Sequence, residues 1–167
     1  YEPAVVNTDL PADPNMSTSP SMIGSNAAWA AGYTGAGSRI AIIDTGTDTD
    51  HQSFDEGAFR YSLSQQAKEA GMTEEAYLEQ LDLLDKEEIA SVLDQLHVSA
   101  TAEELYRSTK LPFAFNYVDK SLDVTHDNDT QTEHGSHVAG IAAANAYIPN
   151  GDGTYAKALD QVLVQGV

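Results

Sequence analysis

The fold of this chain is decided by residues 132–145, which read TEHGSHVAGIAAAN. The residues after His137 are small and mostly apolar, a pattern typical of a helix buried inside a domain. His134 would lie in the first turn of that helix, where Gly135 lets another part of the chain approach closely. An imidazole at a helix entrance can exchange protons near neutral pH, so His134 is a candidate acid or base.

A second stretch carries another candidate residue. Residues 38–46 read SRIAIIDTG, and the four apolar residues at 40–43 predict a parallel strand covered on both faces. Catalytic groups gather beyond the carboxyl ends of such strands, and Asp44 stands at this end. Asp44 is therefore a second candidate for catalytic chemistry.

Together the two stretches resemble the subtilisin-like serine proteases, the subtilases. That family carries an aspartate motif, matched here at residues 42–46, followed by a histidine motif, matched at residues 134–140. The resemblance covers roughly residues 22–58 and 112–167. It implies an α/β fold, and this chain would be the amino-terminal part of a parallel-sheet domain of that fold.

The resemblance also implies roles for the two residues. Asp44 would orient the imidazole, and His134 would be the general base of an Asp–His–Ser triad. Taken alone, Asp44 would be interpreted as a turn cap after a strand and His134 as a surface histidine. The catalytic interpretation therefore depends on the two motifs occurring together.

The nucleophile of such a triad is missing. Subtilases present their serine in a glycine-threonine-serine motif well downstream of the histidine, and no such motif occurs here. Ser136 stands where the family commonly has threonine and is interpreted as structural. The serine is therefore expected on a larger carboxy-terminal fragment of the same precursor, separated by self-cleavage or by truncation.

The domain organisation is predicted as an extended arm at 1–21 and a partial catalytic domain at 22–167. The arm holds most of the prolines together with serine, threonine and asparagine. Residues 60–111 are predicted as an acidic helical insertion, since apolar residues recur there at helical spacing. Two roles are possible for this insertion: a solvent-exposed addition with no function of its own, or an element that steers large or basic protein substrates through its charge.

Capping boxes are predicted at two places in the insertion. In each, an acceptor side chain is followed three residues later by a glutamate, in the pairs Asp85 with Glu88 and Thr101 with Glu104. Each pair predicts the start of a helix.

The composition excludes several classes. Acidic residues outnumber basic ones 26 to 8, for a formal charge of −18, so a nucleic-acid partner is not expected. The chain has no cysteine, which excludes disulfides and thiolate metal sites. No apolar run is long enough to predict a membrane span.

No cofactor is assigned from the sequence, and calcium stays an alternative. The oxygen and imidazole groups of Asp48, Asp50, His51 and Asp55 lie close together in sequence, but calcium needs six or more oxygen ligands. Many subtilases have a calcium-ligating aspartate where this chain has Ser53, which weakens the assignment.

Residues 43–54 and 110–117 are similar to those of the cell-envelope proteinases of streptococci and lactic acid bacteria, which include lactocepins and chemokine- and complement-cleaving peptidases. This subgroup implies a secreted, wall-attached serine endopeptidase with protein substrates such as host chemokines, and a role in virulence. The alternative from a different class is a non-catalytic binding or folding module that kept the scaffold.

Overall fold

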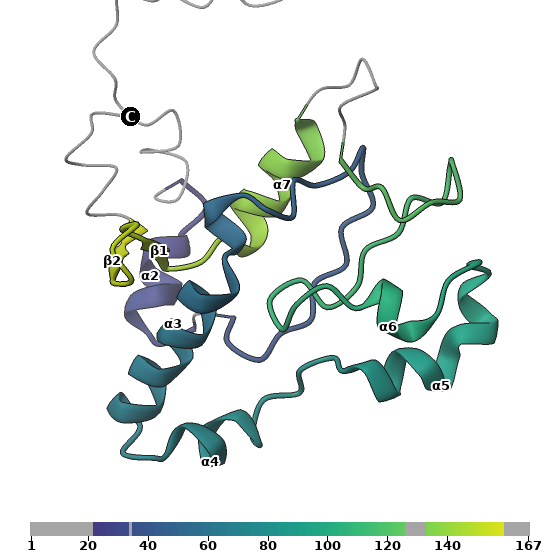
Figure 1. Cartoon of the computed structure of the whole chain (residues 1–167). Helices are drawn as coiled ribbons and strands as arrows, with labels where there is room; N and C mark the ends of the chain where they lie inside the picture. The colour runs from purple at the N-terminus through teal and green to yellow at the C-terminus, as the bar shows by residue number, and fades with distance from the viewer. Residues whose placement is uncertain (1–21, 34, 126–132, 159–167) are drawn as a thin grey trace, which may run out of the picture. The chain divides into compact units, whose positions relative to one another are not determined.

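The computed structural model describes three stretches of the chain, residues 22–33, 35–125 and 133–158 (Figure 1). The chain divides into two compact units, one made of Tyr1–Ala36 with Lys157–Val167 and the other of Gly37–Ala156. The predicted arm at 1–21 lies outside the described residues.

The described part of the first unit contains one short helix, α2 (Ser25–Ala30). Gly24 precedes it with φ 78°, a left-handed conformation that favours glycine, and Gly32 follows it with φ 90°. The two glycines bound the helix on both sides.

The second unit carries the other elements, except that Lys157 at the end of β2 falls in the first unit. Its helical part comprises η1 (Gln52–Phe54), α3 (Glu56–Glu69), α4 (Glu74–Leu78), α5 (Lys86–Leu96), α6 (Ala102–Leu105) and α7 (His134–Ala143). A two-stranded sheet follows α7, formed by β1 (Tyr147–Pro149) and β2 (Tyr155–Lys157).

Helix α3 is the packing centre of this unit, since it contacts both α4 and β1. Its buried residues include Ala58, Leu63 and Ala67. Tyr61 stacks on Tyr155, with ring centroids 5.0 Å apart. Burial of these apolar and aromatic groups fixes α3 against the strands.

The predicted capping boxes are confirmed. The Asp85 side chain accepts from the Glu88 N–H while the Glu88 carboxylate accepts from the Asp85 N–H, and Thr101 and Glu104 do the same. The first helix of the region starts earlier than residue 60, because the Asp55 carboxylate accepts from Ala58 N–H at 2.7 Å and caps α3. That residues 60–111 are an insertion stays a prediction.

The parallel strand predicted at residues 38–43 is wrong for the part of the chain that the structure describes. These residues are irregular and join no sheet. Ile40 is 55% exposed and Ile43 is 99% exposed. A parallel strand needs neighbouring strands on its edges, and the described residues supply none beside it.

Helix α7 matches the prediction in position but is less buried than expected. Gly135 and Ala139 are buried, whereas Ile141 on another face is 69% exposed. The apolar residues of α7 therefore include one on a face that the described residues do not cover.

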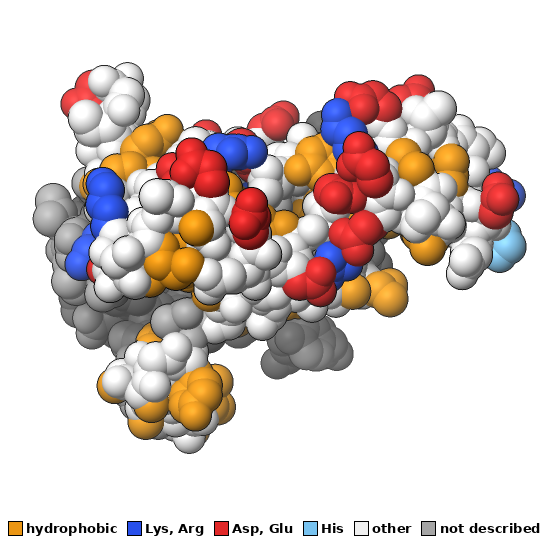
Figure 2. Space-filling view, turned by 90° about the horizontal axis from the view of Figure 1, so that it is seen from below, with side chains coloured by type: hydrophobic (Ala, Val, Ile, Leu, Met, Phe, Trp, Pro, Cys, Tyr) orange, Lys and Arg blue, Asp and Glu red, His pale blue; other side chains and the backbone are white. Residues whose placement is uncertain are grey.

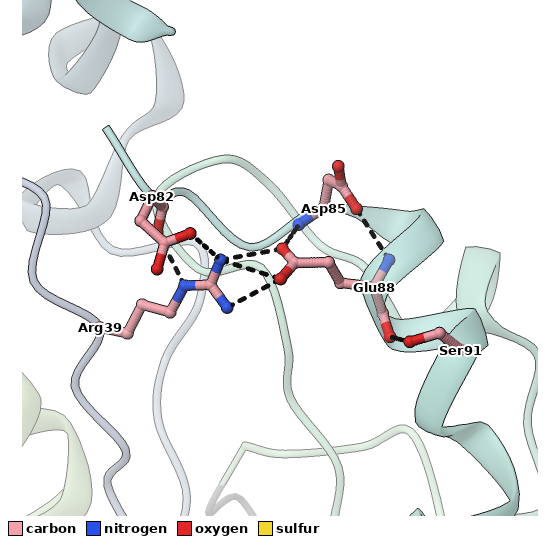
Figure 3. Close-up of polar contacts among 5 residues, drawn as sticks. All are labelled: Arg39, Asp82, Asp85, Glu88 and Ser91. Carbon is pink, nitrogen blue, oxygen red and sulfur yellow. Dashed lines mark hydrogen bonds and ion pairs between the residues drawn. The ribbon is translucent and has the colours of Figure 1, made fainter. Parts of the chain in front are cut away.

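Arg39 connects the segment before Asp44 to the acidic helices (Figure 3). Its guanidinium donates to the Asp82 carboxylate at 2.8 Å, to the Asp82 carbonyl oxygen at 2.7 Å and to both Glu88 carboxylate oxygens at 2.9–3.1 Å. Bidentate pairing suits the planar guanidinium and gives a defined geometry.

The surface that α4 and α5 present in the lower part of Figure 1 is shown in Figure 2. Acidic side chains are spread over it, with fewer basic ones and scattered apolar ones. A membrane-crossing helix would have to be longer and more apolar than any that the described stretches contain.

Candidate catalytic site

The candidate site is formed by Asp44 and His134. The Nδ1 atom of His134 lies 2.7 Å from Oδ1 of Asp44, which is hydrogen-bond distance. The Asp44 side chain is 16% exposed, whereas the His134 side chain is 66% exposed. The carboxylate is therefore covered on most sides and the imidazole is open to an approaching group.

Two glycines allow close main-chain contacts around the site. Gly46 has φ 126°, and a Cβ at this position would overlap the carbonyl oxygen of Val124. A Cβ at Gly135 would overlap the carbonyl oxygen of Gly46. We predicted that Gly135 would let another part of the chain approach closely. This approach occurs, and the approaching segment is the one that carries Asp44.

Hydrogen bonds fix this contact on either side of the glycines. The Gly135 N–H donates to Thr45 Oγ1 at 3.2 Å, and the Asp48 N–H donates to Ser136 Oγ at 2.8 Å. The Ser136 hydroxyl thus joins α7 to the loop after Asp44, in keeping with its structural interpretation. The role of Thr45 was not predicted, because its acceptor function depends on a residue 90 positions away.

The pKa of Asp44 is lowered from its ordinary value of 3.8. The largest cause is the hydrogen bond from His134, and the second is the Thr45 main-chain N–H, which donates to Oδ1 at 2.8 Å. Both hydrogen bonds favour the charged carboxylate. Asp44 is therefore ionised at neutral pH and can accept the Nδ1 proton of His134.

This arrangement sets the chemistry available to His134. With Nδ1 donating to Asp44, Nε2 of the neutral imidazole carries the lone pair and can accept a proton. A carboxylate in this place also stabilises the imidazolium that forms. The arrangement leaves Nε2 free to accept a proton from a group that approaches the exposed side of the imidazole.

The residues considered for calcium are engaged in local turns. Asp48 accepts from the Asp50 N–H at 3.1 Å, and His51 Nδ1 accepts from the Ser53 N–H at 3.2 Å. Asp55 caps α3. Within the three described stretches, no group of three or more histidine, aspartate or glutamate side chains is placed to hold a metal ion.

Comparison with known proteins gives a family match. The sequence model of the Subtilase family matches residues 35–162, which contain both motifs. No solved structure gives a significant match to the chain.

Individual relatives are proteinases of lactobacilli and lactococci. The chain is 31% identical over 114 residues to a PII-type proteinase of Lacticaseibacillus paracasei, an alignment that covers 68% of this chain and 5% of that protein. It is 30% identical over 114 residues to the PI-type proteinase of Lactococcus lactis subsp. cremoris, with 68% and 5% covered. For the PIII-type proteinase of strain SK11 the identity is also 30% over 114 residues, covering 68% of the chain and 4% of the relative. The chain thus matches about one twentieth of the length of these relatives.

Proposed function

Because the chain belongs to the subtilase family, we propose that it supplies the aspartate and the histidine of an Asp–His–Ser triad to a serine endopeptidase. The observation that supports this proposal is the 2.7 Å contact between His134 Nδ1 and Asp44 Oδ1. Both residues belong to the motifs by which the sequence resembles subtilases.

In the proposed reaction, a serine hydroxyl attacks the scissile carbonyl while His134 Nε2 takes its proton. Asp44 holds the imidazole in the tautomer with the proton on Nδ1 and stabilises the imidazolium. His134 then returns the proton to the leaving amine, and water repeats the cycle on the acyl-enzyme. Donors that receive the oxyanion would come from the part of the enzyme that carries the serine.

The serine is proposed to come from a larger carboxy-terminal part of the same precursor. Ser136, the serine nearest to His134 in sequence, already accepts from the Asp48 N–H. Exposed isoleucines at positions 40, 43 and 141 offer apolar surface for the rest of a domain. The much greater length of the relatives is consistent with a larger enzyme.

The enzyme is proposed to be secreted and attached to the bacterial cell wall, with proteins as substrates. The support is the similarity to proteinases of Lacticaseibacillus and Lactococcus, together with the subgroup resemblance of residues 43–54 and 110–117. Host chemokines are one proposed substrate class, from the same resemblance. The acidic segment at 60–111 would attract basic regions of such substrates through its charge.

The test is peptidase activity of the full-length protein, meaning the proposed precursor that also carries the serine, with Asp44→Asn or His134→Ala. We expect kcat to fall about 10⁴-fold in each variant, because the base is lost or held in the wrong tautomer. The matched controls are Asp50→Asn in the same loop and His137→Gln on the same helix, both at exposed residues. They are expected to keep activity within about twofold.

Full activity in both triad variants, with normal folding, would reject the catalytic role. Binding of protein substrates that persists in those variants would then favour the non-catalytic module.

A further inference from the structure

Asn145 is a buried amide whose contacts lie at the far end of α7 from His134. The residue is 6% exposed. Its main-chain N–H donates to the Ser53 carbonyl oxygen at 2.8 Å, and its side-chain Nδ2 donates to the Asp55 carbonyl oxygen at 2.8 Å. Both acceptors lie on the segment that follows Asp44.

Helix α7 is therefore attached to that segment at two points. The first lies at the His134 end, where the Gly135 N–H donates to Thr45 Oγ1 and the Asp48 N–H donates to Ser136 Oγ, and the second is the pair of Asn145 bonds beyond the last turn. Ten helical residues separate the two points by about 15 Å. Two attachments fix the direction of a rod, whereas one attachment leaves the rod free to tilt.

The tilt of α7 matters because His134 is the first residue of the helix. Catalytic groups have to be held within about 0.5 Å and 10–20° of their productive geometry. His134 projects from the helix to reach Asp44, so a tilt about the Gly135 contact changes the angle and length of that hydrogen bond.

The hydrogen bonding of Asn145 supports a role other than stability. Its Oδ1 atom is buried and has no partner among the described residues. A buried acceptor without a partner is unfavourable, and an apolar residue of similar volume would avoid it. The amide is useful here for its Nδ2 donor, which reaches the Asp55 carbonyl oxygen.

We propose that Asn145 is a positioning residue: it sets the direction of α7 and thereby the position of the His134 imidazole relative to the Asp44 carboxylate. The proposal rests on the proposed function of these two residues. Asn145 acts through the helix and does not touch the reacting atoms.

The experiment uses the full-length protein with Asn145→Asp and Asn145→Ala. The first is nearly isosteric but loses the donor, and the second removes the donor without adding a buried charge. Asn150→Asp and Asn150→Ala are the matched controls, because Asn150 Nδ2 donates to Thr154 Oγ1 at 2.8 Å in an exposed turn. Each control repeats the change in composition and charge.

Two readouts separate positioning from stability, both taken well below the melting temperature of each variant. Peptide hydrolysis should show kcat lowered about tenfold to a hundredfold with KM within about twofold. Hydrogen–deuterium exchange at the imidazole carbon of His134, followed by mass spectrometry against pH, should shift toward the profile of Asp44→Asn. The Asn150 variants should match the wild type in both.

Wild-type kcat and a wild-type exchange profile in the Asn145 variants, even with a lowered melting temperature, would overturn the proposal. If Asp44→Asn and His134→Ala kept full activity, the proposed function would fail instead. The exchange profile of His134 would then decide by itself whether Asn145 positions the imidazole. If Asn145→Asp does not fold, the kinetics and the hydrogen–deuterium exchange are measured on Asn145→Ala, and the same outcomes decide.

Discussion

Gly46 and Gly135 touch main chain to main chain, 89 positions apart in sequence, and a Cβ on Gly135 would overlap the carbonyl oxygen of Gly46. This contact places the residue before Gly135 beside the residue two before Gly46. The pairing of His134 with Asp44 thus requires that position 135 carry no side chain.

Gly135→Ala is expected to destabilise the protein by at least about 2–3 kcal/mol, because the new methyl group overlaps backbone that cannot rotate away. The matched control is Gly140→Ala in the same helix, where a Cβ meets nothing within 4 Å. There the better helix propensity of alanine should add up to about 1 kcal/mol. Denaturant unfolding of the full-length protein measures both, and equal effects would contradict the glycine contact.

The lowered pKa of Asp44 predicts a specific acid dependence. A carboxyl whose folded pKa lies below its ordinary 3.8 contributes stability that is complete above 3.8 and is lost as the pH falls through the folded value. In His134→Ala the largest cause is removed but the Thr45 N–H remains, so the pKa should rise toward 3.8 without reaching it.

The measurement is a ¹³C NMR titration of the Asp44 carboxyl carbon after selective labelling of aspartate. An identical titration of wild type and His134→Ala would show that the His134 hydrogen bond does not lower the pKa of Asp44.

Ser136→Ala should lower the free energy of unfolding by about 1 kcal/mol, because the Asp48 N–H loses its acceptor. Ser136→Thr keeps a hydroxyl at the same position and should stay within about 0.5 kcal/mol of the wild type. Peptidase activity should survive in both variants, measured by hydrolysis of a protein substrate. A loss of activity comparable to that of His134→Ala would instead make Ser136 the nucleophile.

Arg39→Gln should detach the acidic helices from the segment before Asp44. Exposed ion pairs contribute about 0.2–1 kcal/mol each, and Arg39 pairs with both Asp82 and Glu88, so a loss of about 0.4–2 kcal/mol is expected. The control is Arg60→Gln, which breaks a single pair with Glu56 and should lose about 0.5 kcal/mol or less.

Urea unfolding in low and high salt tests this prediction, since screening should reduce the Arg39 effect in particular. Equal, salt-independent losses in the two variants would argue that Arg39 acts through packing of its aliphatic stem.

The features predicted correctly from sequence are those encoded over short distances or by recognisable motifs. The capping boxes span three residues, so Asp85 with Glu88 specified a helix start without knowledge of the fold. The two motifs carried the Asp44 and His134 prediction through the family resemblance. In the structure these two side chains lie together, while their catalytic role remains to be measured.

The features that sequence reasoning missed depend on distant partners. The segment at 38–43 has the composition of a buried strand, yet strand pairing is decided by which other strands lie alongside it. Arg39 showed no sign of pairing with Glu88, 49 positions away. Asn145 was not singled out from the sequence, because its side chain bonds the Asp55 carbonyl oxygen, 90 positions away.

The exposed isoleucines at positions 40 and 43 have a practical consequence for handling the chain. Ile40 and Ile43 expose apolar side chains on an irregular segment, and β-branched residues exposed in this way favour self-association. Isolated preparations should therefore precipitate as their concentration rises. Ile43→Lys would place a charge on this surface and keep such preparations soluble. The same charge would weaken any later binding of the rest of the domain to this surface.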